Sequence, residues 1–252
     1  MIKNTLVVIP TRLGATRLPN KPLADICGKP MIVRVWEKAI RADVGPVIVA
    51  SAEQEIVDII ESLGGHGVLT HSSLATGTDR VKAAVDMYDP QGKYSHVINI
   101  QGDLPTLEPD LVRHVLEPFE DPTVDMATLA TPITDPHELT DGNVVKIALS
   151  LRDGKDIGRA LYFSRNLMPS GDGPHFHHIG LYAYTRDCLN RFVDLPVNDL
   201  EVRERLEQLR ALAHGIRIEV KLVETQAPFG VDTPADLAKA IRVIRALEAR
   251  SV

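Results

Sequence analysis

Short apolar runs alternate with amphipathic stretches through the first hundred residues. Runs rich in β-branched residues predict four buried strands, at residues 6–9, 47–50, 67–70 and 97–100. Apolar residues at helical spacing predict the helices between them, at residues 30–41, 53–63 and 78–87. This strand–helix alternation is typical of a mostly parallel sheet whose crossovers are right-handed.

The second half of the chain follows a different pattern. Further strands are predicted at residues 126–134, 144–151, 179–184 and 218–223, separated by longer polar or Gly/Pro-rich pieces such as 169–174. Leucines at helical spacing predict one amphipathic helix over 199–214, and Thr233 and Pro234 are typical of a helix start. We therefore expect one α/β domain over residues 1–252. It would hold a mostly parallel central sheet with helices on both faces and inserted antiparallel strands.

A cationic loop follows the first predicted strand. Pro10 is expected to end that strand because it has no N–H for a sheet ladder. The loop carries Arg12, Arg17 and Lys21 but no acid, and its residues 14–16 (Gly-Ala-Thr) are small. Open α/β sheets bind ligands at the carboxyl ends of their strands, so this loop predicts a polyphosphate site. The alternative is an ordinary solvated basic loop.

Two acids occupy positions suited to a hard cation. Asp103 follows a glycine just beyond the fourth strand, and Asp232 precedes the last predicted helix. Magnesium needs only one or two carboxylates together with phosphate oxygens and waters, so the pair predicts a shared magnesium site. Alternatively, Asp103 forms a turn and Asp232 stabilises a helix dipole.

Two further clusters of polar side chains are candidates for binding a ligand or a metal. Glu207 and Gln208 flank the apolar side of the 199–214 helix and could bond the hydroxyls of a polyol, or simply face solvent. The histidine-rich run at 175–178 lacks HExxH spacing and a nearby cysteine, so we do not expect zinc there.

Composition excludes several classes. Among 252 residues 44% are apolar, which is ample for a core, and the net charge of −6 argues against general nucleic-acid binding. Cys27 and Cys188 form no CxxC motif and are expected to be reduced and structural. No signal-peptide pattern or membrane-length apolar run is found, which predicts a cytoplasmic protein without membrane contact. The dinucleotide GxGxxG, the P-loop and the GxSxG elbow are also missing from the sequence.

Taken in order, the motifs resemble one family. They read IPTRLGATRLPNKPLADICGKPMI, QGDLP, ALYFSR, HHIGLYAY, LEQLRAL and GVDTPADL, spread from about residue 5 to 240. This set is similar to the 3-deoxy-manno-octulosonate cytidylyltransferases, which make CMP-Kdo and pyrophosphate from CTP and the acid sugar Kdo for lipopolysaccharide synthesis. The resemblance implies a nucleotide-diphospho-sugar transferase fold, a magnesium cofactor and a homodimer. It also implies a dimerisation and sugar-binding insertion roughly within residues 155–200.

The resemblance also assigns site residues by position. The CTP phosphates would be held by Arg12, Arg17 and Lys21, and the rest of the nucleotide by Gly77, Thr78 and Arg80. Asp103 and Asp232 would be the magnesium ligands, and with Lys21 and Arg12 they would form the catalytic set. The Kdo pocket would be lined by Gln101, His178, Tyr182, Glu207 and Gln208, with Arg165 nearby. No side chain is identified as a general base.

The chain departs from the family pattern at several positions, of which Leu104 in place of a common Glu and Ala15 in place of a common Ser are the milder ones. Ser51-Ala52 replaces a usual Thr-Asp, and residues 71–76 read HSSLAT where the family usually has a segment like RxDHxS. The altered segment at residues 71–76 is expected near the base and ribose, so it bears on selectivity for the base, whereas the phosphate and metal residues are all present. The alternatives kept open are a cytidylyltransferase for another acidic sugar, such as 8-amino-Kdo or sialic acid, and a non-catalytic nucleotide- or sugar-binding paralogue.

Overall fold

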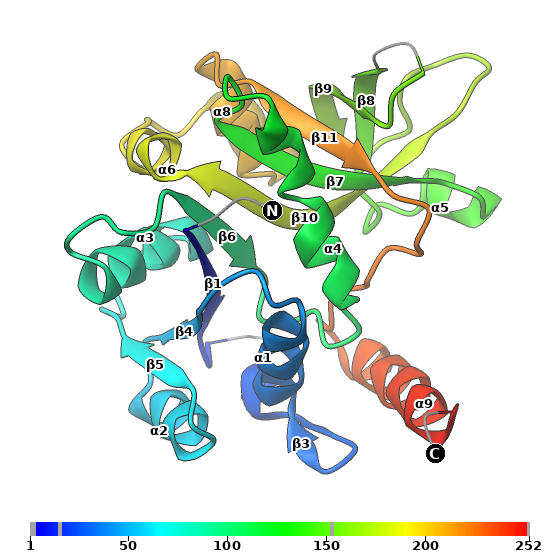
Figure 1. Cartoon of the computed structure of the whole chain (residues 1–252). Coiled ribbons are helices and arrows are strands. Elements are labelled where there is room, and N and C mark those ends of the chain that lie inside the picture. Colours follow the sequence, from blue (N-terminus) through cyan, green and yellow to red (C-terminus); the bar gives the residue numbers. More distant parts are fainter. Residues whose placement is uncertain (1–3, 15–16, 152–153, 251–252) are drawn as a thin grey trace. The chain divides into compact units, whose positions relative to one another are not determined.

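The computed structural model describes residues 4–14, 17–151 and 154–250 and groups them into two compact units (Figure 1). Among the described residues, those from 4 to 112 and from 228 to 250 form the terminal unit, and those from 113 to 227 form the central unit. Ala15 and Thr16, two of the small residues noted in the cationic loop, lie outside the described residues. The assignment of the whole chain to a single domain stays a prediction.

The terminal unit is built on parallel strands in the order β5-β4-β1-β6. Their bounds are Thr5–Thr11 for β1, Val47–Ser51 for β4, His66–Leu69 for β5 and His96–Ile100 for β6. Three crossover helices connect them, α1 (Met31–Arg41), α2 (Gln54–Ser62) and α3 (Gly77–Tyr88). Figure 1 shows α3 on one face of these strands and α1 and α2 on the other, as right-handed crossovers require. The predicted α/β fold is confirmed.

Pro10 lies inside β1, so the prediction that it ends the strand is wrong. The pairing of β1 with β6 stops at Val8, whereas its pairing with β4 continues to Thr11. Beyond Val8 the strand has a free side, and a residue without an N–H is tolerated there because one side of the ladder needs no donor. The strand therefore continues past Pro10 and ends at Thr11.

The C-terminal helix packs against the segment that follows the cationic loop. That segment holds a short 3₁₀ helix, η1 (Lys21–Leu23), and a two-stranded ribbon, β2 (Asp25–Ile26) and β3 (Lys29–Pro30). Ile26 and Met31 form an apolar cluster with Val231 and with two residues of α9 (Pro234–Arg250). Helix α4 (Pro109–His114) contains the boundary between the two units. Burial of this cluster therefore brings the chain's last described helix back to its first loop.

The central unit has a mixed sheet in the order β10-β7-β11-β9-β8, and β8 also pairs with β10, so this order closes on itself. The strands are β7 (Met126–Pro132), β8 (Lys146–Leu151), β9 (Ile157–Ser164), β10 (Phe176–Thr185) and β11 (Ile218–Leu222). Only β7 and β11 pair in parallel among these described strands. The helices are η2 (Glu117–Glu120), α5 (Pro136–Thr140), α6 (Arg186–Val193), α7 (Asp199–Glu204) and α8 (Gln208–Ala213). Strand β9 was not among the predicted strands.

The single helix expected over 199–214 is two helices, so that prediction is wrong. Arg205 caps α7 with φ 56° and ψ 47°, a left-handed conformation that breaks the helical path. Leu206 and Leu209 are buried after the break, but Leu200 before it is 37% exposed. The leucine spacing therefore does not form one continuous apolar stripe.

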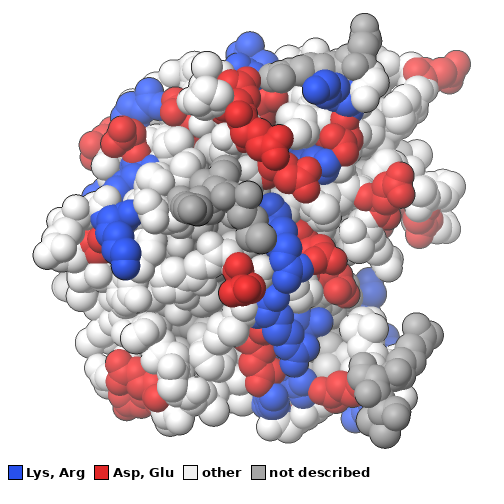
Figure 2. Space-filling view, viewed as in Figure 1, with Lys and Arg blue, Asp and Glu red and all other residues white. Residues whose placement is uncertain are grey.

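The surface shows no single-sign face in the view of Figure 2, where acidic and basic side chains of the described residues lie interspersed. The helices of the described chain are all too short or too polar to cross a membrane.

Replacing Arg205 by glycine should stabilise the protein. Glycine adopts positive φ without a Cβ penalty, so we expect Arg205→Gly to raise the free energy of unfolding by about 0.5–1 kcal/mol. The matched control is Arg203→Gly inside α7, which should lower it by about 0.5–1 kcal/mol. Urea titrations measure both, and a loss of stability in Arg205→Gly would contradict the left-handed cap.

Candidate functional site

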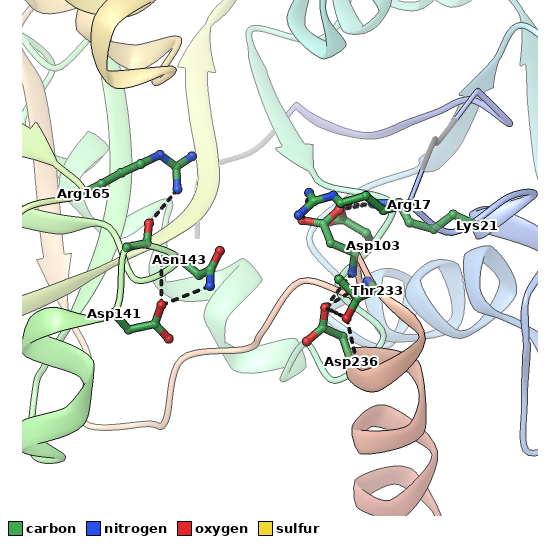
Figure 3. A network of polar contacts seen from close by, with 10 residues as sticks. Arg17, Lys21, Asp103, Asp141, Asn143, Arg165, Thr233 and Asp236 are labelled. Atoms are coloured by element: carbon green, nitrogen blue, oxygen red, sulfur yellow. Dashed lines mark hydrogen bonds and ion pairs between the residues drawn. The ribbon is translucent and has the colours of Figure 1, made fainter.

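Three segments far apart in the sequence converge on the ammonium group of Lys21 in the terminal unit (Figure 3). Lys21 Nζ lies 2.7 Å from Asp103 Oδ2 and 2.9 Å from Asp232 Oδ1. Arg17 Nη2 lies 3.1 Å from the other oxygen of Asp232. Two carboxylates and two cations thus form one connected network.

Backbone contacts fix the positions of the two residues that carry these carboxylates. The N–H of Val231 donates to the carbonyl oxygen of Asp103 at 3.0 Å, which fixes the residue next to Asp232 on the turn after β6. That turn approaches β1 closely, because a Cβ on Gly102 would meet the Pro10 carbonyl oxygen at 3.0 Å. A glycine is therefore needed for Asp103 to reach this position.

The start of α9 is capped without using Asp232. Thr233 Oγ1 accepts from the N–H of Asp236 at 3.2 Å, and the Asp236 carboxylate accepts from the N–H of Thr233 at 2.9 Å. This reciprocal cap confirms the predicted helix start at Thr233. Because the capping groups come from elsewhere, the Asp232 carboxylate is available for Lys21 and Arg17.

The charges of the network set the protonation of Lys21. Burial acts to lower the pKa of the Lys21 ammonium, but the charges and hydrogen bonds of Asp103 and Asp232 outweigh it and raise that pKa above 10.5. Lys21 is therefore a permanent cation at neutral pH. The two aspartates present hard oxygen donors to one shared cation position, a donor set that fits magnesium.

The remaining nucleotide-site predictions fall near the start of α3. Thr76 and Asp79 form a reciprocal cap there, and Gly77 and Thr78 open the helix. Arg80 is buried and donates from Nη1 to the hydroxyl of Thr70. Burial lowers the pKa of the Arg80 guanidinium, Glu53 opposes this, and the charge of Arg12 lowers it further. Arg12 and Arg80 thus share one cationic region.

Gln101 belongs to the terminal unit. It precedes Asp103 by two residues, in the segment that follows β6. Its side-chain amide donates to Asn99 Oδ1 at 3.2 Å.

The other predicted sugar contacts cluster in the central unit. The ring centroids of His178 and Tyr182 lie 5.5 Å apart on β10. Burial lowers the pKa of the His178 imidazole from 6.5 to about 3, and His177 adds to this, so the ring is neutral at pH 7. Burial raises the pKa of the Tyr182 hydroxyl well above 10, and the charge of Glu207 adds to the shift. Gln208 is buried at the start of α8, beside Glu207.

Arg165 was expected to pair with an acidic or hydroxyl group, and the structure shows backbone partners. Its Nε donates to the Glu204 carbonyl oxygen at 3.2 Å. Its Nη1 donates to the Gly142 carbonyl oxygen at 3.0 Å, the contact drawn from Arg165 in Figure 3. The Glu204 carboxylate in turn accepts from the Ser164 hydroxyl at 3.0 Å.

Sequence reasoning missed a buried lysine that supports this region. Lys146 is fully buried, and its ammonium donates to the backbone carbonyls of Asp141, Val144 and Arg165. A lysine in an apolar strand at residues 144–151 was the only signal that could have found it.

Comparisons with known proteins agree on one family. A family model described as cytidylyltransferase matches residues 6–218. A 3-deoxy-manno-octulosonate cytidylyltransferase from Paramagnetospirillum magneticum is 54% identical, covering 96% of this chain and 98% of the relative. The chain belongs to the 3-deoxy-manno-octulosonate cytidylyltransferase family. A further relative of that name from Parvibaculum lavamentivorans is 56% identical over 93% of this chain and 90% of its own length.

Solved structures support the same family. A CMP:2-keto-3-deoxy-manno-octonic acid synthetase in complex with CTP superposes with a TM-score of 0.87 at 36% identity, covering 99% of this chain and 100% of the other. A glucose-1-phosphate thymidylyltransferase from Bacillus anthracis has a TM-score of 0.64 at 14% identity, covering 96% and 95%, and shows the fold alone. Within this cytidylyltransferase, the substrate contacts of individual residues stay predictions.

The neutral His178 predicts an acid-sensitive fold. Its folded pKa of about 3 lies below the ordinary 6.5, so only the unfolded chain takes up this proton between these values. The stabilising contribution is therefore present above pH 6.5 and falls as the pH falls, by about 2 kcal/mol at pH 5.

The measurement is the free energy of unfolding at pH 7 and pH 5. His178→Gln should reduce the difference between the two values relative to the unmodified protein. The exposed His137 supplies the control, since His137→Gln should leave the difference unchanged. Equal pH dependence in the His178 variant and the parent protein would contradict a neutral buried ring.

Proposed function

We propose that this chain transfers the cytidylyl group of CTP to Kdo, giving CMP-Kdo and pyrophosphate for lipopolysaccharide synthesis. The observation that carries this proposal is the 54% identity, over 96% of the chain, to a 3-deoxy-manno-octulosonate cytidylyltransferase. The geometry of both units is consistent with it, because each holds one of the two sets of groups that the reaction needs.

The terminal unit supplies the charged set. Arg12, Arg17 and Lys21 would neutralise the triphosphate of CTP, and the first turn of α3 with Arg80 would contact the rest of the nucleotide. Phosphoryl and nucleotidyl transfer depend mainly on positioning and on stabilising charge, and fixed cations provide both. Lys21 suits this role because its neighbouring carboxylates keep it protonated.

Asp103 and Asp232 would hold magnesium. When bound, the ion neutralises phosphate oxygens and the developing charge of the leaving pyrophosphate. Both carboxylates contact the ammonium of Lys21, and this closeness supports a cation position shared by the two. Their contribution as residues is to supply oxygen donors on a turn and at a helix start whose backbones are tied together.

The central unit supplies the neutral set for the sugar. His178, Tyr182 and Gln208 would donate to or accept from sugar hydroxyls, and Glu207 would accept from them. Arg165 would add a cation near this set. Gln101 of the terminal unit is proposed for the sugar as well.

The reaction follows from these two sets. The 2-hydroxyl oxygen of Kdo attacks the α-phosphorus of CTP in line with the bond to the β-phosphate. The new oxygen–phosphorus bond forms as that bond breaks, the hydroxyl proton is released to solvent, and pyrophosphate departs.

We also propose that the enzyme acts as a homodimer in the cytoplasm. Exposed apolar side chains of the central unit support a buried interface there, among them Leu161, Val197 and Val202, at 56%, 63% and 63% exposure. Sedimentation of the native protein at the mass of one chain would contradict the dimer.

Pyrophosphate release tests the reaction. With Kdo and magnesium present, we expect release with CTP and little or none with ATP, GTP or UTP. Release with another nucleotide would mean that the altered residues 71–76 have changed base selectivity. Release only with 8-amino-Kdo or sialic acid would replace the proposed sugar, and binding of CTP without any release would favour a non-catalytic protein.

Replacing Asp103 tests the metal-binding role. Asp103→Asn removes one oxygen charge while keeping the side-chain shape, so we expect kcat to fall about 100-fold or more. The dissociation constant for CTP should change much less, because the cations remain. Asp86→Asn on α3 of the same unit is the matched control and should keep full turnover. Unchanged turnover in Asp103→Asn would remove the metal hypothesis.

A further inference from the structure

Strand β10 breaks its register with β7 between two predicted sugar contacts. Ile179 lies opposite Leu129, but the next paired residue, Tyr182, lies opposite Thr128. Gly180 and Leu181 are therefore bulged out of the ladder. Bulges redirect the side chains around them, and this bulge lies between the predicted sugar contacts His178 and Tyr182.

One buried hydroxyl contacts three groups at this bulge. Thr128 is fully buried, and its Oγ1 lies 2.8 Å from the Leu181 carbonyl oxygen and 3.1 Å from the Ile179 carbonyl oxygen. The same oxygen lies 3.0 Å from Nε2 of His178. Thr128 thus links the backbone at the bulge to the imidazole.

The number of hydrogens available at Thr128 determines the tautomer of His178. A hydroxyl has one hydrogen, and carbonyl oxygens can only accept, so the Thr128 hydrogen is required by Leu181 and Ile179. The contact to His178 is then satisfied only if Nε2 carries a hydrogen and donates it to Thr128 Oγ1. Because the ring is neutral, its lone pair is on Nδ1.

Neighbouring rings fix the plane of this imidazole. Phe163 meets His178 edge-on, with ring centroids 4.9 Å apart and planes at 76°, and Tyr182 packs at 5.5 Å. A ring held on two sides and by one hydrogen bond has a defined direction for Nδ1.

We propose that Thr128 is a positioning residue for the sugar, whose hydroxyl sets His178 as the Nε2–H tautomer and so makes Nδ1 a hydrogen-bond acceptor for a sugar hydroxyl. This role rests on the proposed function, in which His178 contacts Kdo. An acceptor nitrogen binds a hydroxyl but repels a carboxylate, so Thr128 would also orient the acid sugar, with its hydroxyls rather than its carboxylate at His178.

The tautomer is tested first, without any substrate. Nitrogen-15 chemical shifts of the histidine rings, assigned by comparison with His178→Gln, distinguish protonated from unprotonated ring nitrogens. We expect Nε2 to be protonated in the unmodified protein and in Thr128→Ser, which keeps the hydroxyl. In Thr128→Val the Nδ1–H form should gain population. Protonated Nδ1 in the unmodified protein overturns the proposal even if neither Thr128 variant folds, and an unchanged tautomer in a folded Thr128→Val overturns it too.

The effect on the sugar is tested by steady-state kinetics. Thr128→Val should raise the KM for Kdo about tenfold, because the loss of one hydrogen bond weakens binding by about this factor. The KM for CTP should stay the same. Thr128→Ser should restore the KM for Kdo. An unchanged KM for Kdo in Thr128→Val would overturn the positioning role.

The experiments distinguish failure of the proposed function from failure of the positioning role. If the unmodified protein releases no pyrophosphate with CTP and Kdo, the sugar role falls with that function, while the tautomer measurement still decides whether Thr128 sets His178.

Discussion

The shared ammonium of Lys21 is the interaction on which the terminal unit's site depends. Asp103 and Asp232 lie close enough to contact one nitrogen atom, and two carboxylates at that separation repel each other unless a cation lies between them. Lys21 provides this compensation from a 3₁₀ helix whose position is fixed by the packing of the chain after it. Charge compensation of this kind lets the two carboxylates approach one nitrogen atom from segments far apart in the chain.

The chain reaches this arrangement through apolar burial rather than through the charges themselves. Ion pairs that are partly exposed contribute little stability, and the side chain of Asp232 is 47% exposed. The cluster of Ile26, Met31 and Val231 with the apolar face of α9 is fully or nearly fully buried, and it holds the segment before α9 beside the loop. The charged groups therefore exploit a geometry that hydrophobic packing has already established.

Much of this could be predicted from the sequence, and the failures have identifiable causes. Strong apolar runs predicted the parallel strands of the terminal unit, because a strand buried on both faces needs little else to be recognised. The break at Arg205 could not be predicted, since arginine rarely adopts positive φ and leucine spacing continued across it. Strand β9 alternates buried and exposed residues from Gly158 to Leu161, a period-2 signal that is visible but short. At the site, cationic and acidic residues could be predicted as a set, but not their contacts: Lys21 and Asp232 are 211 positions apart, and only the fold brings them together.

The two units differ in the chemistry they present, and this difference matches the two substrates. The terminal unit gathers permanent charges, which suit a triphosphate whose binding is mainly electrostatic. The central unit instead buries neutral groups, because desolvation keeps His178 unprotonated and Tyr182 protonated. Neutral donors and acceptors recognise hydroxyls by geometry, and a buried polar group left unpaired is costly, so such a site rejects a sugar that lacks the matching hydroxyl. If the central unit binds the sugar as proposed, burial of His178, Tyr182 and Gln208 supplies a basis for sugar specificity that charge alone could not provide.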